Sequence, residues 1–308
     1  MAITAKDIAA LREQTGVGMM ECKKALTEAN GDLEKAVVLL RERGLAAAAK
    51  KAGRVAAEGI VYSYVTDCCG TGVVIEVNIE TDFAANNAAF QQFVKDLAAI
   101  VAKENPADVD ALKALPYPGT EGDVAAELQN KVLTIGENIQ IRRFARIEGG
   151  KGIANASYVH MGGKIGVMVT MEVAEGFEKN DEILALGKDL CMQVAAMRPT
   201  WVSKDDVPAD RIASEKEILM AQTINEGKPA AVAEKIVTGR MRKFYEEFCL
   251  VDQLFIRDNE TAINKVIDGV SKKVGSPIKV LSFVRFEKGE GIAKKEDDFA
   301  AEVASMVK

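Results

Sequence analysis

Apolar residues recur at helical spacing through the first 45 positions, and two short turns interrupt them. Thr4 and Asp7 form a capping-box pattern, with aspartate in place of the usual glutamate or glutamine, ahead of the first apolar positions. The turns fall at Thr15–Gly18 and at Asn30-Gly31, where glycine punctuates the pattern. We therefore predict a domain of three short helices over residues 1–45.

The third of these helices is expected to end where a second kind of composition begins. Asp32 can cap it, and Gly44 is a typical C-terminal residue for it. Residues 46–58 are rich in alanine and lysine and offer few large apolar groups to bury. We interpret them as a solvated, partly helical linker and place a domain boundary there.

An internal repeat follows the linker and dominates the rest of the pattern. Ser63-Tyr64-Val65 recurs as Ser157-Tyr158-Val159, and each copy precedes a run rich in β-branched residues, at 73–79 and 166–173. Apolar positions at helical spacing come next in each copy. The sequence thus predicts two copies of a strand pair followed by a helix, one over residues 59–154 and one over 155–294.

A third strand motif closes each copy, and its wider spacing reveals an insertion. Phe144-x-Arg-x-Glu-x-Gly-x-Gly-Ile-Ala154 returns as Phe283-x-Arg-x-Glu-x-Gly-x-Gly-Ile-Ala293. The extra residues of the second copy fit an antiparallel helical hairpin over about 209–250, and residues 295–308 predict a short C-terminal helix. The predicted fold class is α+β, a duplicated α/β core with an inserted hairpin. Apolar positions of the hairpin arms are Ile212, Leu219, Val237, Met241, Phe244 and Phe248.

Composition narrows the classes of function. The net charge of −6 argues against a protein that binds nucleic acid with its whole surface. The N-terminus has no signal-peptide pattern, and no apolar run approaches the ~20 residues that span a bilayer, so we expect a cytoplasmic protein without membrane partners. Five cysteines without a CxxC pair argue against a secreted disulfide framework.

The sequence lacks the motifs of the common enzyme classes. It contains no GxxxxGK[ST], no GxGxxG after a strand and no GxSxG, and it has a single histidine, His160. Cys68-Cys69 is interpreted as part of a turn between strands and not as a redox pair. We therefore expect no metal, no cofactor and no catalytic turnover, and we favour an interaction protein.

Two segments are specific enough to suggest a family. They are Leu11-Arg-Glu-Gln-Thr-Gly-Val-Gly-Met-Met-Glu-Cys-Lys-Lys-Ala-Leu26 and Glu76-Val-Asn-Ile-Glu-Thr-Asp-Phe-Ala-Ala-Asn86. Both closely resemble the signature segments of bacterial translation elongation factor Ts. The resemblance covers essentially the whole chain in order, and further matching segments are Ile135-Gly-Glu-Asn-Ile139 with Arg142-Arg143, Tyr158-x-His160, Gly239-Arg-Met241 and Asp298-Phe-Ala-Ala-Glu302.

The resemblance implies a partner, the GTPase elongation factor Tu, and an activity, release of its GDP. It implies that residues 1–45 form a ubiquitin-associated-like module that grips the GTPase. It also implies that a wedge acts near the GTPase's magnesium site. By motif match, the implied partner-binding residues are Met19, Met20, Cys22 and Lys23 in the module, Thr81, Asp82 and Phe83 in the wedge, and Ile135 and His160 in the rest of the core.

Several alternatives remain open at this level. Phe83 could pack under its own helix, as its repeat mate Phe177 could, and either Thr81 or Asp82 could serve as a helix N-cap. Ile79 and Ala84 depart from the family pattern beside the wedge.

Rival functions also differ in what they require. An adaptor or scaffold without exchange activity would need only the three-helix module, and an RNA-binding or chaperone protein would need basic and aromatic residues on a sheet. The hairpin could brace the partner, or it could form a homodimer or a 2:2 complex.

Overall fold

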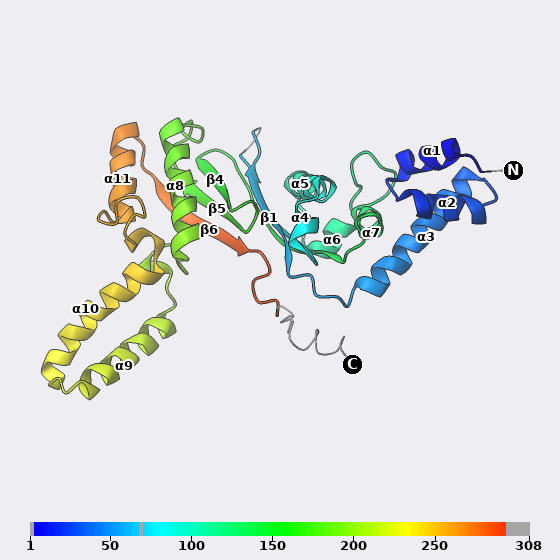
Figure 1. The fold of residues 1–308 in the computed structure, drawn as a ribbon. Helices are drawn as coiled ribbons and strands as arrows, with labels where there is room; N and C mark the ends of the chain where they lie inside the picture. The colour runs from blue at the N-terminus through cyan, green and yellow to red at the C-terminus, as the bar shows by residue number, and fades with distance from the viewer. Residues whose placement is uncertain (1–2, 68–69, 294–308) are drawn as a thin grey trace.

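The computed structural model describes residues 3–67 and 70–293, and it shows an elongated molecule (Figure 1). The helices α1–α3 lie at one end, two small antiparallel sheets with their covering helices lie in the middle, and the pair α9 and α10 projects at the other end. Helices and antiparallel sheets are thus segregated, which agrees with the predicted α+β class. The predicted C-terminal helix and the Cys68-Cys69 pair lie outside the described residues.

The first three helices pack around a small apolar cluster of their own. They are α1 (Ala5–Thr15), α2 (Met19–Glu28) and α3 (Leu33–Lys51). The predicted capping box is present: the Asp7 amide donates to Thr4 Oγ1 over 3.3 Å, and the Thr4 amide donates to Asp7 Oδ2 over 2.9 Å. Members of the cluster are Leu11, Val17, Cys22, Ala25, Leu26, Ala29, Ala36 and Leu40.

The prediction that the third helix ends at Gly44 is wrong, because α3 continues to Lys51. Residues 45–51 are strong helix formers, and nothing in their sequence stops propagation. Gly44 lies against the backbone of Gln129 in α7 (Val124–Ile135), and Lys51 Nζ donates to the Val132 carbonyl over 3.4 Å. The first half of the predicted linker is therefore a helical strut that packs on α7.

Two three-stranded sheets form the centre, and each has its hydrogen-bonded strands in the order of the sequence. The first consists of β1 (Glu58–Val65), β2 (Gly72–Ile79) and β3 (Ile139–Ile147). The second consists of β4 (Ile153–His160), β5 (Ile165–Glu172) and β6 (Lys279–Glu287). Helices of this region are α5 (Ala88–Glu104), α6 (Val109–Lys113), α8 (Asp181–Met197) and α11 (Ile263–Val274).

The two sheets repeat each other in detail, as the duplicated motifs predict. The register of the first shifts between Glu76 and Val77, and that of the second shifts between Thr170 and Met171. Helices α5 and α8 both begin after an asparagine N-cap at φ −66° and ψ 128°. Each copy therefore builds the same strand pairing and the same helix start.

The sheets pack on each other through an apolar layer in which small residues allow close approach. Val61, Val74 and Met168 are fully buried in it, and a side chain at Gly72 would collide with Met168. The edge strand β1 also bonds directly to the second copy, since the Val61 amide donates to the Gly163 carbonyl over 2.8 Å.

A buried carboxylate ties the far end of the chain to the first sheet. Glu76 on β2 is fully buried and accepts from Arg142 Nη1 at 2.9 Å and from Arg143 Nε at 2.6 Å. Its Oε1 also accepts from the amide of Gly289, in the turn after β6, over 2.8 Å. Arg142 in turn donates to the carbonyl of Glu290.

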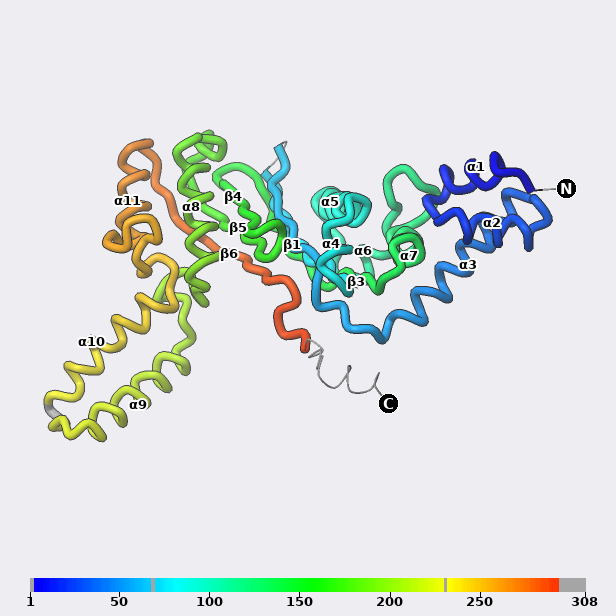
Figure 2. Tube along the Cα trace, viewed as in Figure 1, coloured from blue at the N-terminus to red at the C-terminus, as the bar shows by residue number. Residues whose placement is uncertain are grey.

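Two helices occupy the segment that the sequence assigns to a hairpin. Helix α9 (Ala209–Asn225) runs antiparallel to α10 (Ala230–Phe248), and the tube in Figure 2 follows both arms to their tip. The apolar positions identified from the sequence face one another in one cluster, in which Val237, Met241 and Phe244 are buried and Ile212, Leu219 and Phe248 are partly buried. Short 3₁₀ turns flank the arms at Lys204–Asp206 and Leu250–Asp252.

Candidate functional site

The most exposed large apolar side chain among the described residues stands at a corner of the first sheet. Phe83 belongs to α4 (Asp82–Ala85), a single turn between β2 and α5, and 88% of its surface is exposed. The next two residues, Ala84 and Ala85, are buried in the core of the first copy. The turn is thus anchored by its alanines while the aromatic ring remains in solvent.

Thr81 is the N-cap of this turn, which settles one alternative left open by the sequence. Its backbone is extended, and its Oγ1 accepts from the Ala84 amide over 3.1 Å. Asp82 therefore occupies the first helical position, and its exposed carboxylate does not serve as the cap. A negative charge at a helix N-terminus is favourable, and Asp82 stands at that position of α4.

A carboxylate from another element holds the N-cap. Glu137 accepts from the Thr81 amide at Oε2 over 2.9 Å and from Thr81 Oγ1 at Oε1 over 2.7 Å. It follows Gly136, whose left-handed conformation ends α7. Ile135, the last residue of α7, is partly buried against the same core, so the structure brings Ile135 to the corner that carries Thr81, Asp82 and Phe83.

A second set of bonds fixes the backbone on both sides of this clamp. Glu80 accepts from the Asn138 amide over 2.6 Å and pairs with Arg54 at 3.5 Å. The side-chain amide of Asn138 donates to the Arg54 carbonyl over 2.7 Å. The residues that follow α3 are thereby tied to the corner.

Comparison with the second copy shows that Phe83 breaks the repeat. Its mate Phe177 is partly buried and packs against the core of the second copy, as the alternative interpretation expected for either ring. Phe83 does not. The two departures from the family pattern, Ile79 and Ala84, are both buried in the core of the first copy, on which α4 packs.

His160 lies at the end of β4, in a turn that contacts the same edge strand as α4. Its Nδ1 is 2.9 Å from the hydroxyl of Tyr158, and its side chain is partly buried. The turn packs against Ile60 of β1 through Gly163, and Ile60 shares a cluster with the alanines of α4. Met161, at the tip of this turn, is 70% exposed.

The residues predicted on α2 lie apart from this corner, on the helices at one end of the molecule (Figure 2). Met19 and Met20 are exposed, Met20 to 66%, and Lys23 is exposed beside them. Cys22 is fully buried, and its thiol donates to the Val17 carbonyl over 3.3 Å. The predicted role of Cys22 in partner binding stays a prediction; in this structure its side chain supports the helix that presents its neighbours.

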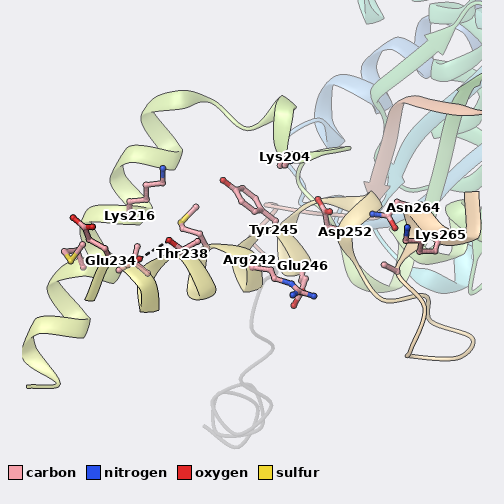
Figure 3. A pocket seen from close by; sticks show the side chains of 14 residues that line it. Lys204, Lys216, Glu234, Thr238, Arg242, Tyr245, Glu246, Asp252, Asn264 and Lys265 are labelled. Atoms are coloured by element: carbon pink, nitrogen blue, oxygen red, sulfur yellow. Dashed lines mark hydrogen bonds and ion pairs between the residues drawn. The ribbon is translucent and has the colours of Figure 1, made fainter. Parts of the chain in front are cut away.

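A hollow of about 740 Å³ lies between the hairpin and the core (Figure 3). Lys216 of α9 and Tyr245 of α10 extend along it, and Asp252 and Asn264 lie at its end beside the core. Burial raises the pKa of Asp252, whose Oδ2 has no hydrogen-bond partner within residues 3–67 and 70–293. The lining carries both signs of charge and contains no histidine or cysteine.

The described part of the chain contains no group of three or more histidine, cysteine, aspartate or glutamate side chains arranged to hold a metal ion. None of the helices within it combines the length and the apolarity that crossing a bilayer requires. What the geometry offers is an exposed aromatic ring on a braced corner. The fold is that of an α+β protein, and its most exposed large apolar side chain among the described residues stands on this corner.

Comparison with known proteins gives the family. Residues 80–290 match the family model described as Elongation factor TS. Elongation factor Ts of Syntrophotalea carbinolica is 46% identical over 308 residues, 100% of both chains. The proteins of that name from Clostridium kluyveri and from Clostridium perfringens strain SM101 are 49% and 50% identical over 307 residues, 99% of each chain. The chain belongs to the elongation factor Ts family, which comprises elongation factors of protein biosynthesis, and the resemblance noted in its motifs is confirmed.

Proposed function

We propose that this protein is a guanine-nucleotide exchange factor that releases GDP from the GTPase elongation factor Tu, in the cytoplasm and without chemical turnover of its own. The observation that carries the proposal is the exposure of Phe83 on a turn that the rest of the core holds in place. Large side chains that fill a pocket at the centre of an interface contribute most of its binding energy. A ring held in solvent is suited to that role.

Exchange follows from linkage between two ligands of one GTPase. If this protein binds the nucleotide-free GTPase more tightly than the GDP form, it must weaken GDP binding by the same factor. Faster release also requires a transient complex of all three components. In that complex, Phe83 and Asp82 disturb the magnesium and phosphate region of the GTPase, and the negative charge of Asp82 disfavours the neighbouring phosphates.

Docking is assigned to surfaces that do not depend on the nucleotide. In this proposal, α1–α3 form a ubiquitin-associated-like module that contacts the GTPase through Met19, Met20 and Lys23, since methionine side chains adapt to a partner's surface. Ile135 and His160 add contacts beside the wedge. The two copies of the core form the frame, and the hairpin braces the partner or a second copy of the complex.

The test is the rate of release of fluorescent GDP from the GTPase, measured by stopped flow. Phe83→Ala should slow catalysed release by at least about tenfold. It should weaken docking to the GDP-bound GTPase by less than about threefold, because the ring makes its contact mainly in the exchange complex. Leu281→Ala, which truncates an exposed apolar side chain on β6, is the matched control and should change neither. Unchanged release by Phe83→Ala would contradict the wedge.

The adaptor alternative is separated by the same assay. An adaptor that uses only α1–α3 would bind the GTPase and leave its GDP release at the intrinsic rate even when saturating. Acceleration by the unmodified chain rejects it.

A further inference from the structure

The helix that carries Phe83 is too short to hold its own shape. It has four residues, and a first helical turn costs more conformational entropy than its few hydrogen bonds return. The pose of the Phe83 ring therefore depends on what surrounds the turn. The buried pair Ala84 and Ala85 anchors one side, and the N-cap anchors the other.

The hydroxyl of the N-cap Thr81 makes two hydrogen bonds, one as a donor and one as an acceptor. Thr81 Oγ1 gives its only hydrogen to Glu137, over 2.7 Å, and accepts from the Ala84 amide, over 3.1 Å. The Thr81 amide donates to the other oxygen of the same carboxylate, over 2.9 Å. Bonds to an ionised acceptor are stronger than neutral ones, and two of them from one residue fix both its backbone and its side-chain rotamer.

Glu137 is itself held in place. The left-handed Gly136 ends α7 directly before it, and the amide of Asn138 is bonded to Glu80 directly after it. The carboxylate thus reaches Thr81 from a backbone with both sides fixed, across 56 residues of sequence.

We propose that Glu137 is the positioning residue for the Phe83 ring, acting through Thr81; the inference rests on the proposed exchange function. Thr81 is exposed and Glu137 is partly exposed, so the clamp contributes little to global stability. Its effect is local: it keeps α4 wound and keeps the ring in one orientation, so that binding energy is not used to order it.

A double-mutant cycle tests this. Release of fluorescent GDP from the GTPase is measured with Glu137→Ala, Phe83→Ala and the double variant, over a range of exchange-factor concentrations. Glu137→Ala alone should lower the maximal release rate by about tenfold with little change in half-saturation. In the Phe83→Ala background it should change the rate by less than about twofold, because a residue that acts only through the ring has nothing left to position.

Hydrogen exchange gives a readout that does not involve the partner. The Ala84 and Ala85 amides should exchange faster in Glu137→Ala while the urea midpoint stays within error. Glu137→Gln keeps one carbonyl oxygen as an acceptor, so its exchange rates at Ala84 and Ala85 should lie between those of the unmodified chain and those of Glu137→Ala. Asp258→Ala is the control, since Asp258 accepts from the amides of Glu260 and Thr261 in an exposed loop elsewhere.

The outcomes separate this inference from the function on which it rests. Additive effects in the cycle, or unchanged exchange at Ala84 and Ala85, would overturn the inference alone. If the unmodified chain leaves GDP release at its intrinsic rate, the proposed function falls. If Phe83→Ala by itself leaves the accelerated release unchanged, the wedge falls and the kinetic role of Glu137 falls with it. Slower release that also appears with Asp258→Ala would assign the effect to general destabilisation and overturn the positioning role.

Discussion

Burial changes the chemistry of two of the three free cysteines in the described part of the chain. Desolvation raises the pKa of Cys191 to about 12 and that of Cys249 to about 11. The thiol of Cys191 also donates to the Ala156 carbonyl over 3.2 Å. Both side chains behave as small apolar groups, and neither is a nucleophile at neutral pH.

The raised pKa of Cys191 predicts a loss of stability at alkaline pH. Above pH 9 the unfolded chain releases this proton while the native chain keeps it until about pH 12. The unfolded state then binds fewer protons, so the free energy of unfolding falls as pH rises, by up to about 1.4 kcal/mol per pH unit. The free energy of unfolding, measured by urea titration between pH 8.5 and 10.5, should fall less steeply with pH for Cys191→Ala than for the unmodified chain. Parallel slopes would contradict the assignment.

At the scale of elements, the turn after β6 depends on a glycine for space as well as for conformation. Gly289 adopts φ +68°, and a Cβ there would collide with the carbonyl of Ala57, directly before β1. Gly291, at φ +75°, would meet only the Arg142 guanidinium at 4.0 Å.

These two glycines make a matched pair. Both alanine substitutions cost about 1 kcal/mol for the left-handed backbone. Gly289→Ala should cost at least about 2 kcal/mol more, because backbone must move to relieve the collision. Free energies of unfolding from urea titrations measure the difference. Equal losses of unfolding free energy for the two variants would contradict the steric role of Ala57.

The same scale shows which elements the sequence could predict. The hairpin arms are predictable, because Val237, Met241 and Phe244 repeat at helical spacing and bury one stripe. The end of α3 is not, because Gly44 resembles a terminator, whereas the helix formers after it and its packing on α7 let the helix continue. Periodicity reports which face of an element is buried; it does not report which distant element covers that face.

The candidate site was only partly predictable for the same reason. The Thr81-Asp82-Phe83 motif marked the corner, but the sequence left open whether Phe83 or Phe177 would be buried. The clamp by Glu137 joins residues far apart in the chain, and no local pattern encodes it. Cys22 lies within a motif of contact residues, and only the packing of α1–α3 shows that its side chain faces inward.

At the scale of the whole molecule, Glu76 joins three segments that are distant in sequence. It bonds Arg142 and Arg143 of β3 and the amide of Gly289, from a fully buried position. Two guanidinium groups neutralise a carboxylate that would otherwise be costly to bury. The C-terminal end of β6 is thereby fastened to the first sheet.

Removing this carboxylate should destabilise the entire core. Glu76→Ala is expected to lower the free energy of unfolding by about 3–5 kcal/mol, because both arginines lose their buried partner. Glu290→Ala removes the exposed carboxylate 3.0 Å from Arg143 and should cost less than about 1 kcal/mol. Urea unfolding followed by circular dichroism compares them. A loss for Glu76→Ala no greater than that for Glu290→Ala would rule out the role of the buried network.

The pairing of β5 with β6 has a consequence for how the chain is made. The buried central strand β5 (Ile165–Glu172) receives one of its two neighbours only from Lys279–Glu287, which follows α8, the hairpin and α11 in the chain. During synthesis, the apolar strand β5 therefore has one unpaired edge while the hairpin and α11 are being made. Contacts between such distant segments form slowly, and unpaired edges invite aggregation. A nascent chain of this protein therefore completes its second sheet only after the hairpin and α11 have been made.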